Sequence, residues 1–125
     1  MTPQSRVRIG VAISALSSLV FVMSAAMKLW GGAPVREGMA HLGLAESLIL
    51  PIAILELACV VVYLVPATSV LGAILLTGYL GGAVCAHLRV GDPYFVPIVL
   101  GVLVWGGLFL REQRLRELLP LRKRG

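Results

Sequence analysis

The chain has 125 residues, of which 58% are hydrophobic and 14% charged, and its mean hydropathy is +0.94. Soluble domains carry roughly 25% charged residues, so this composition excludes a soluble globular domain and indicates an integral membrane protein. The net charge of +5 comes mainly from residues that flank the apolar runs, where they act as membrane anchors, and we therefore expect no nucleic-acid partner.

Four apolar runs follow one another along the chain, each roughly 17 to 22 residues long. At about 1.5 Å per residue, a helix of this length crosses most or all of a ~30 Å hydrocarbon core. Strands are excluded because an open sheet would leave backbone groups unpaired in lipid, and the runs lack the alternation of a membrane barrel. The sequence therefore predicts an all-α integral membrane four-helix bundle, with spans at about residues 9–30, 48–65, 69–88 and 94–110.

The first span carries a polar stripe. Ser14, Ser17, Phe21, Ser24 and Lys28 recur at steps of three and four, which places them on one face of a helix. Lipid does not favour serines and a lysine, so this face is predicted to pack against protein. An alternative interpretation is a cleaved signal peptide, because the run has a basic start and ends in small residues, although its apolar core is long for one.

The loop after the first span is predicted to hold a short external helix at about residues 35–43, with Pro34 near its start and Gly43 at its stop. The second span then carries Glu56 near its middle. A charge at mid-span costs roughly 2.5 to 3.5 kcal/mol, and the Leu, Ile and Val residues around it supply about 4 to 7 kcal/mol, so insertion tolerates it. Glu56 shares a helix face with Tyr63.

The third span holds two features that bear on packing. Gly78 and Gly82 form a small-xxx-small pair, which predicts a close contact with another helix. Cys85 in this span and Cys59 in the second are expected at depths about 12 Å apart, beyond the ~7 Å limit for a disulfide. We therefore expect two free thiols.

Most of the basic residues belong to one side of the predicted bundle. With four spans, both termini share that side with eight of the eleven Lys and Arg residues, namely Arg6, Arg8, Arg111, Arg114, Arg116, Arg122, Lys123 and Arg124. The positive-inside rule places this side in the cytoplasm of a cell whose inner membrane holds the protein. The basic tail, residues 111–125, is predicted to be an amphipathic anchor as far as Pro120.

The polar residues of different spans are expected to meet in the outer half of the bundle. Side chains lean toward the N-terminus of their helix, so Lys28 and His87 lean into the membrane while Glu56 leans toward them. We predict Glu56, Lys28 and His87 as catalytic groups and assign cofactor contacts to a second set of residues, Tyr63, Arg89, Asp92 and His41. The last three of these are also predicted, together with Arg36, to form the rim of the site. In the alternative interpretation Lys28 and Glu56 are a purely structural ion pair. Taken alone, Lys28 is expected to extend outward to the membrane surface, as long basic side chains near helix ends do. The acidic and histidine residues lack ligand spacing, so no metal site is expected.

The order of these pieces resembles the DoxX-like membrane proteins, from about residue 20 to 122. The matching stretches include "SAAMKL", "HLGLAESLILPIAILELACVVVYLVP", "LGAILLTGYLGGAVCAHLRVGDP" and "RLRELLPLR". The resemblance implies a four-helix bundle in the cytoplasmic membrane and an association with membrane redox systems, since the wider group includes a subunit of a thiosulfate:quinone oxidoreductase. On the family's pattern the matching polar and turn residues are Lys28, Glu56, His87, Arg89, Gly91, Asp92 and Pro93.

The combined interpretation is a small accessory subunit of a quinone-linked oxidoreductase, with a quinone in the outer-half pocket. A quinone reaches such a site through lipid and needs a few donors and an acid or base. No intrinsic cofactor is expected, so the redox centre would come from a partner protein. Association with further copies of the same chain, as a homo-oligomer, is the alternative to such a partner. The alternatives are a non-enzymatic membrane scaffold and a small proton-coupled transporter, the latter disfavoured by the absence of broken-helix repeats.

Overall fold

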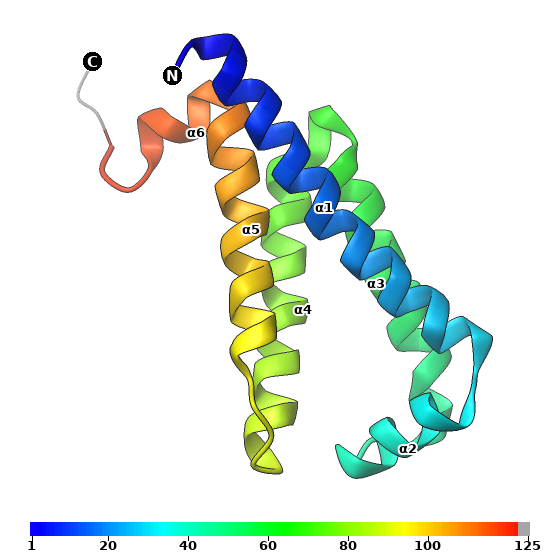
Figure 1. Ribbon diagram of the computed structural model, residues 1–125. Coiled ribbons are helices and arrows are strands. Elements are labelled where there is room, and N and C mark those ends of the chain that lie inside the picture. The colour runs from blue at the N-terminus through cyan, green and yellow to red at the C-terminus, as the bar shows by residue number, and fades with distance from the viewer. Residues whose placement is uncertain (123–125) are drawn as a thin grey trace.

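The structure is a computed structural model that describes residues 1–122. Within these residues every regular element is a helix, which confirms the all-α prediction (Figure 1). The elements are α1 (Pro3–Trp30), α2 (Ala33–His41), η1 (Glu46–Leu48), α3 (Ile49–Leu64), η2 (Pro66–Thr68), α4 (Ser69–Arg89), α5 (Phe95–Arg111) and α6 (Gln113–Leu118), where η denotes a 3₁₀ turn.

Several helices are suited to a bilayer. In residues 1–122, three segments are long and apolar enough to cross a membrane, namely Pro3–Trp30, Glu46–Leu64 and Pro66–Arg89. Helix α5 is also apolar but shorter, with 17 residues. Large apolar side chains such as Leu16, Met23 and Ile54 point outward from these helices, and a lipid environment accommodates such surfaces.

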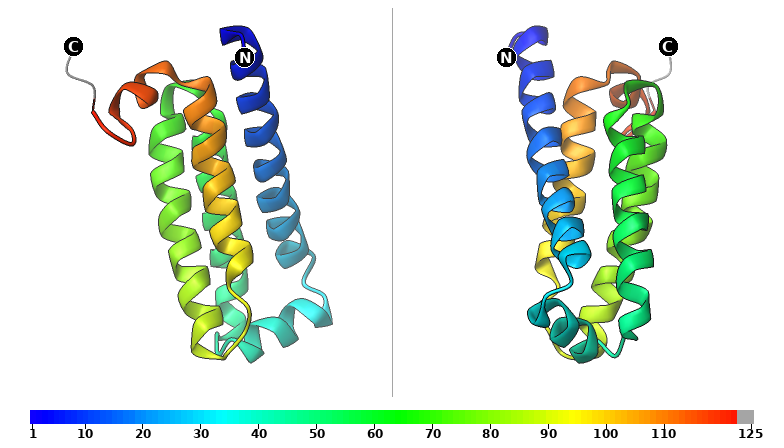
Figure 2. Two further views of the ribbon diagram at one scale, coloured as in Figure 1. Left: turned by 60° about the vertical axis from the view of Figure 1, so that its left-hand side comes forward. Right: turned by 90° about the vertical axis from the view of Figure 1, so that its right-hand side faces the viewer.

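The four long helices form a bundle. Helix α1 packs against α5 and α3, and α4 packs against α3 and α5 (Figure 2). The N-terminus, the α3–α4 turn and α6 lie at one end of the bundle, here called the N-terminal end (Figure 1). Helix α2 and the α4–α5 connection lie at the opposite end, the α2 end (Figures 1 and 2).

Local sequence signals account for the helix ends. Helix α1 starts where the Thr2 side chain accepts a hydrogen bond from the backbone N–H of Ser5, with Pro3 as the first helical residue. It ends at Gly31, whose φ of 74° is a left-handed conformation that glycine adopts without strain. Helix α1 therefore begins six residues before the expected position 9, while α3, α4 and α5 each lie within one residue of the expected spans at both ends.

The polar stripe of α1 faces the bundle, as predicted. Ser14, Ser17 and Phe21 are buried, and Ser24 and Lys28 are partly buried. The Ser14 Oγ lies 2.9 Å from the Tyr63 Oη, and the Tyr63 Oη donates to the backbone oxygen of Val104 at 2.7 Å. A hydroxyl has a single hydrogen, so Ser14 is the donor to Tyr63. This chain of hydrogen bonds joins α1, α3 and α5.

Arg111 extends this network at the N-terminal end. Its Nε donates to the Ser14 Oγ at 3.0 Å, and its guanidinium lies 5.1 Å from the centroid of the Tyr63 ring. The contact with Tyr63 has the geometry of a cation–π interaction. Ser14, Tyr63, Val104 and Arg111 are called the N-terminal network below.

The prediction that Gly78 and Gly82 form a close helix contact is wrong. A Cβ added at either glycine would meet no atom within 4 Å. The tight contacts lie elsewhere: a Cβ at Gly72 would collide with the backbone of Tyr63, and one at Gly10 would lie 2.7 Å from the Gly107 oxygen. A small-residue pattern shows where helices can approach, but it does not show which glycines face a neighbouring helix.

The C-terminal segment folds back onto the bundle. Helix α6 begins at Gln113 and ends at Leu118, close to the expected stop at Pro120, and Leu115 is buried in the core. The Arg116 guanidinium donates to the backbone oxygens of Phe109 and Leu110, each at 2.9 Å, which satisfies carbonyls at the end of α5. The last three residues of the predicted basic tail, 123–125, lie outside the described residues.

Candidate functional site

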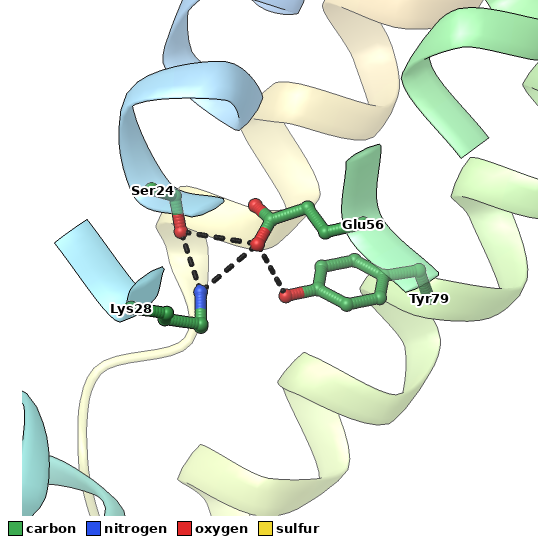
Figure 3. Close-up of polar contacts among 4 residues, drawn as sticks. All are labelled: Ser24, Lys28, Glu56 and Tyr79. Atoms are coloured by element: carbon green, nitrogen blue, oxygen red, sulfur yellow. Dashed lines mark hydrogen bonds and ion pairs between the residues drawn. The ribbon is translucent and has the colours of Figure 1, made fainter. Parts of the chain in front are cut away.

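Lys28 and Glu56 form a buried ion pair. The Lys28 Nζ lies 2.9 Å from the Glu56 Oε2 (Figure 3), and the two side chains are 17% and 1% exposed. The pair joins the last turns of α1 to the middle of α3. Side chains that lean toward the start of their own helix meet across an antiparallel pair in this way.

Two hydroxyl groups complete a polar cluster around the same oxygen. The Tyr79 Oη and the Ser24 Oγ donate to the Glu56 Oε2 at 3.1 and 3.4 Å, and the Lys28 Nζ also donates to the Ser24 Oγ at 2.7 Å (Figure 3). Ser24, Lys28, Glu56 and Tyr79 are called the polar cluster below. It draws on α1, α3 and α4, so three helices meet at one carboxylate oxygen.

Tyr79 is a site residue that the sequence analysis did not identify. Its ring packs edge-on against Phe21, with 6.4 Å between the centroids, and this contact orients its hydroxyl toward Glu56. The sequence does hold a signal, because Tyr79, Ala83 and His87 follow one another at steps of four along α4. The position of His87 on the predicted inner face therefore pointed to Tyr79 as well.

The polar cluster borders a large apolar cavity. The cavity has a volume of about 1000 Å³ and lies between the long helices, with residues of the α2 segment, such as Met39 and Leu42, at one end. Helices α1 and α3 lean away from α4 and α5 toward the α2 end (Figure 1), and the cavity lies in that half of the bundle. Gly78 and Gly82 are part of its wall, where the lack of side chains leaves the space open.

A second, smaller cavity of about 490 Å³ lies beneath α2. It shares Ser24, Lys28, Met39 and His87 with the large cavity. The amino group of Lys28 therefore stands between a space under the surface helix and the apolar space inside the bundle. This position allows the polar cluster to be approached from the α2 end as well as from the side.

His87 shares the large cavity with Lys28 and Glu56 but does not bond to them. Its Nδ1 donates to the backbone oxygen of Ala83 at 2.7 Å, since a carbonyl can only accept. In the neutral ring the Nε2 is then an acceptor. The structure thus brings the three predicted catalytic residues to one cavity, and it places two of them in direct contact.

The predicted rim residues form a polar link at the α2 end. The His41 Nε2 lies 2.9 Å from both carboxylate oxygens of Asp92, and the Arg89 Nη2 donates to the backbone oxygen of Leu42 at 3.1 Å. Arg89 also lines the large cavity, whereas His41 and Asp92 do not. The two contacts hold the α2 segment against the α4–α5 connection. Because the α2 segment closes one end of the cavity, these contacts fix the position of the segment that covers it. Arg36 lies apart from them, paired with Glu46 at 3.8 Å.

Tyr63 is not part of the cavity, although the sequence analysis assigned it a cofactor contact. It is completely buried in the N-terminal network, as its predicted inward orientation requires. Tyr63 comes seven residues after Glu56, which places it about 10 Å further along the helix. A shared helix face therefore did not mean a shared depth.

The two cysteines are free thiols, Cys59 buried and Cys85 exposed, and both line the large cavity. Within residues 1–122, no three His, Cys, Asp or Glu side chains gather in an arrangement that could hold a metal ion. The chemistry available at the cavity is therefore that of one carboxylate, one ammonium group, one guanidinium group, hydroxyls, an imidazole and two thiols.

These observations define the class first: an all-helical chain with apolar helices around a buried ion pair is a small helical membrane protein. The family model described as the DoxX-like family matches residues 12–107, and the chain belongs to this family. The match confirms the resemblance found in the sequence; it includes all of the polar cluster and leaves α6 outside. No curated protein and no solved structure matches the chain.

Proposed function

We propose that α1, α3, α4 and α5 each cross the inner membrane and that both termini are cytoplasmic. The support is the charge distribution. Among the Lys and Arg residues of the described part, 1–122, those lying toward the N-terminal end are Arg6, Arg8, Arg111, Arg114, Arg116 and Arg122, and the other three, Lys28, Arg36 and Arg89, lie toward the α2 end. Helix α5 has 17 residues, the lower limit for a span of roughly 17 to 25 residues. In this orientation the large cavity lies in the outer half of the bilayer.

Reporter fusions test this topology. A reporter fused to either terminus is expected to be active only in the cytoplasm, and one inserted at Gly38 in α2 only outside, because the basic end of the bundle is retained on the cytoplasmic side. The measurement is the activity of a pair of reporters that work on opposite sides of the membrane. A cytoplasmic α2 would invert the proposed arrangement.

We further propose that the protein is a membrane subunit of a redox system and that its large cavity binds the head group of a quinone-like molecule. The observation that carries this proposal is the combination of about 1000 Å³ of mostly apolar space with a single polar cluster at its wall. Ligand sites of this kind use apolar walls for affinity and a few polar groups for orientation. A quinone has an apolar tail, travels within the bilayer, and offers a polar ring.

The protein's own residues supply binding and proton exchange in this proposal. The Lys28 ammonium group orients an oxygen of the ring, and the Glu56 carboxylate exchanges a proton with it. The electrons pass to or from a redox centre in a partner protein, which is the part of the reaction that the cavity's side chains do not provide.

Filling the cavity tests the proposed function. A Cβ at Gly78 meets no atom within 4 Å, so Gly78→Leu is expected to leave the fold intact while its side chain occupies the cavity beside Tyr79. We expect the dissociation constant of a short-chain benzoquinone to rise about tenfold or more, which corresponds to a loss of about 1.4 kcal/mol. The measurement is equilibrium binding to the purified protein in nanodiscs.

The matched control lies on the same helix. Gly81 also has space for a side chain but does not line the cavity, so Gly81→Leu is expected to bind the quinone as the wild type does. Equal binding by wild type, Gly78→Leu and Gly81→Leu would reject the cavity as the quinone site. It would leave the membrane scaffold as the better interpretation.

A further inference from the structure

The two oxygens of the Glu56 carboxylate have different surroundings. Lys28, Ser24 and Tyr79 all donate to Oε2, and Oε1 accepts no hydrogen bond from residues 1–122 (Figure 3). Among the described residues, the fully enclosed polar atoms without a partner are the Ser18 Oγ and the Arg111 Nη2. Oε1 is therefore not fully enclosed and keeps some accessible surface. The space that Glu56 borders is the large cavity.

A count of donors and acceptors shows what the polar cluster has left to offer. The hydroxyl hydrogens of Ser24 and Tyr79 are both used toward Oε2. Lys28 has three N–H donors, of which the described contacts with Ser24 and Glu56 use two. The one donor that remains is an N–H of Lys28, whereas the free acceptors are the lone pairs of Oε1 and the unused lone pairs of the Tyr79 and Ser24 hydroxyl oxygens.

His87 adds a second acceptor to the same cavity. Because its Nδ1 donates to the Ala83 oxygen, the Nε2 of the neutral ring can only accept. Glu56 and His87 thus both present acceptors at the wall of a mostly apolar cavity. Buried acceptors are stabilised by water or by a ligand that brings hydrogen-bond donors, and a ligand that displaces the water must supply the donors itself.

We infer that the cavity is selective for a ring with free hydroxyl groups, the reduced quinol, over the corresponding quinone. A quinol hydroxyl can donate to the Glu56 Oε1 and at the same time accept from Lys28. A quinone carbonyl can only accept, so its binding leaves the charged Oε1 without a partner. This inference rests on the proposed function and specifies which redox form of the ligand the site takes.

The test compares three probes that share one decyl tail: a benzoquinol, its benzoquinone, and the dimethyl ether of the quinol. Binding is measured without oxygen in nanodiscs and corrected for partition into lipid. We expect the wild type to bind the quinol about tenfold or more tightly than the quinone, because a hydrogen bond to a charged group contributes roughly 1.5 kcal/mol or more. The dimethyl ether cannot donate and is expected to lose the same advantage.

Glu56→Gln gives the sharpest variant. The three donors from Lys28, Ser24 and Tyr79 hold the amide oxygen in the place of Oε2, which puts the amide NH₂ in the place of Oε1. An acceptor is thereby replaced by a donor, so the preference for the quinol is expected to disappear or reverse. Gly81→Leu, away from the cavity, is expected to keep the preference of the wild type.

The outcomes separate this inference from the proposed function. Absence of binding by both redox forms, or binding that Gly78→Leu does not weaken, would overturn the proposed function. Equal or tighter binding of the quinone, still weakened by Gly78→Leu, would overturn the quinol preference alone. If Glu56→Gln fails to fold, the comparison of the quinol with its dimethyl ether on the wild type decides the inference without it.

Discussion

Lys28→Met is expected to lower the free energy of unfolding by about 3 to 5 kcal/mol, the range found when one partner of a buried ion pair is removed. The physical reason is that the Glu56 carboxylate, 1% exposed, loses its counter-ion and its shortest hydrogen-bonded neighbour. Tyr79 and Ser24 would still donate to Oε2, but neither carries a charge. The measurement is chemical or thermal unfolding in detergent at neutral pH.

The exposed ion pair between Arg36 and Glu46 provides the control. These side chains are 49% and 73% exposed and lie 3.8 Å apart, so Arg36→Met is expected to change stability by less than about 1 kcal/mol. If Lys28→Met were as mild as Arg36→Met, the buried pair would contribute little to the fold. Its charges would then have to be explained by the chemistry of the cavity alone.

A double variant distinguishes a structural pair from a proton-exchanging one. In Lys28→Met with Glu56→Gln no unpaired charge remains, and Tyr79 can still donate to the amide oxygen, so most of the lost stability is expected to return. Glutamine cannot exchange a proton, so quinone-linked activity of membranes is expected to stay low even where the fold is restored. Full activity in the double variant would show that the glutamate only joins α1 to α3.

The Lys28–Glu56 contact could be predicted from the sequence because it depends on few quantities. Hydropathy gave the approximate depth of each residue, the alternation of span direction gave the lean of each side chain, and both groups had the chemistry to pair. The same reasoning placed His87 in the same cavity. It did not give the hydrogen bond of His87 to Ala83, because that contact depends on a rotamer rather than on a helix position.

The predictions failed where a contact depended both on the rotation of a helix about its axis and on the depth of the residue in the bundle. Gly78 and Gly82 have the spacing of a helix contact, yet they face the cavity, and Gly72 packs against Tyr63 instead. The turn between α3 and α4 sets the angle and register at which the two helices pack, and so decides which face of α4 meets α3. Residue types alone do not determine this angle or register. Tyr79 was missed for a related reason, since an aromatic residue in an apolar span is more often a packing residue than a ligand contact.

The two ends of the bundle have different roles in this structure. At the N-terminal end, glycine contacts and the Arg111–Ser14–Tyr63 hydrogen bonds bring the helices close together. At the α2 end the helices enclose a cavity, and the contacts of His41 and Arg89 with the opposite segment hold its cover. Packing at one end thus allows an open space at the other, and variants at the two ends should affect different properties.

Tyr63→Ala is expected to destabilise the protein by about 3 to 5 kcal/mol, the range for removing a large aromatic side chain from a packed core. Tyr63 is fully buried, and its hydroxyl bonds to Val104 of α5 and Ser14 of α1, so the missing ring would leave a space that these helices cannot fill without moving. Tyr63→Phe removes only the hydroxyl and is expected to cost about 1 kcal/mol, because Ser14 then loses its acceptor. Both effects are measured by unfolding in detergent.

The decisive comparison is between Tyr63→Phe and Tyr79→Phe. Each variant removes one hydroxyl from a tyrosine of the bundle, but only Tyr79 lines the cavity and donates to Glu56. Tyr63→Phe is expected to bind the short-chain quinol with wild-type affinity, whereas Tyr79→Phe is expected to change that affinity because Oε2 loses a donor and the charge of the carboxylate is less well stabilised. Weaker quinol binding in a folded Tyr63→Phe protein would show that Tyr63 contacts the ligand, as the helix face that it shares with Glu56 first suggested. The cavity would then have to extend to the N-terminal network.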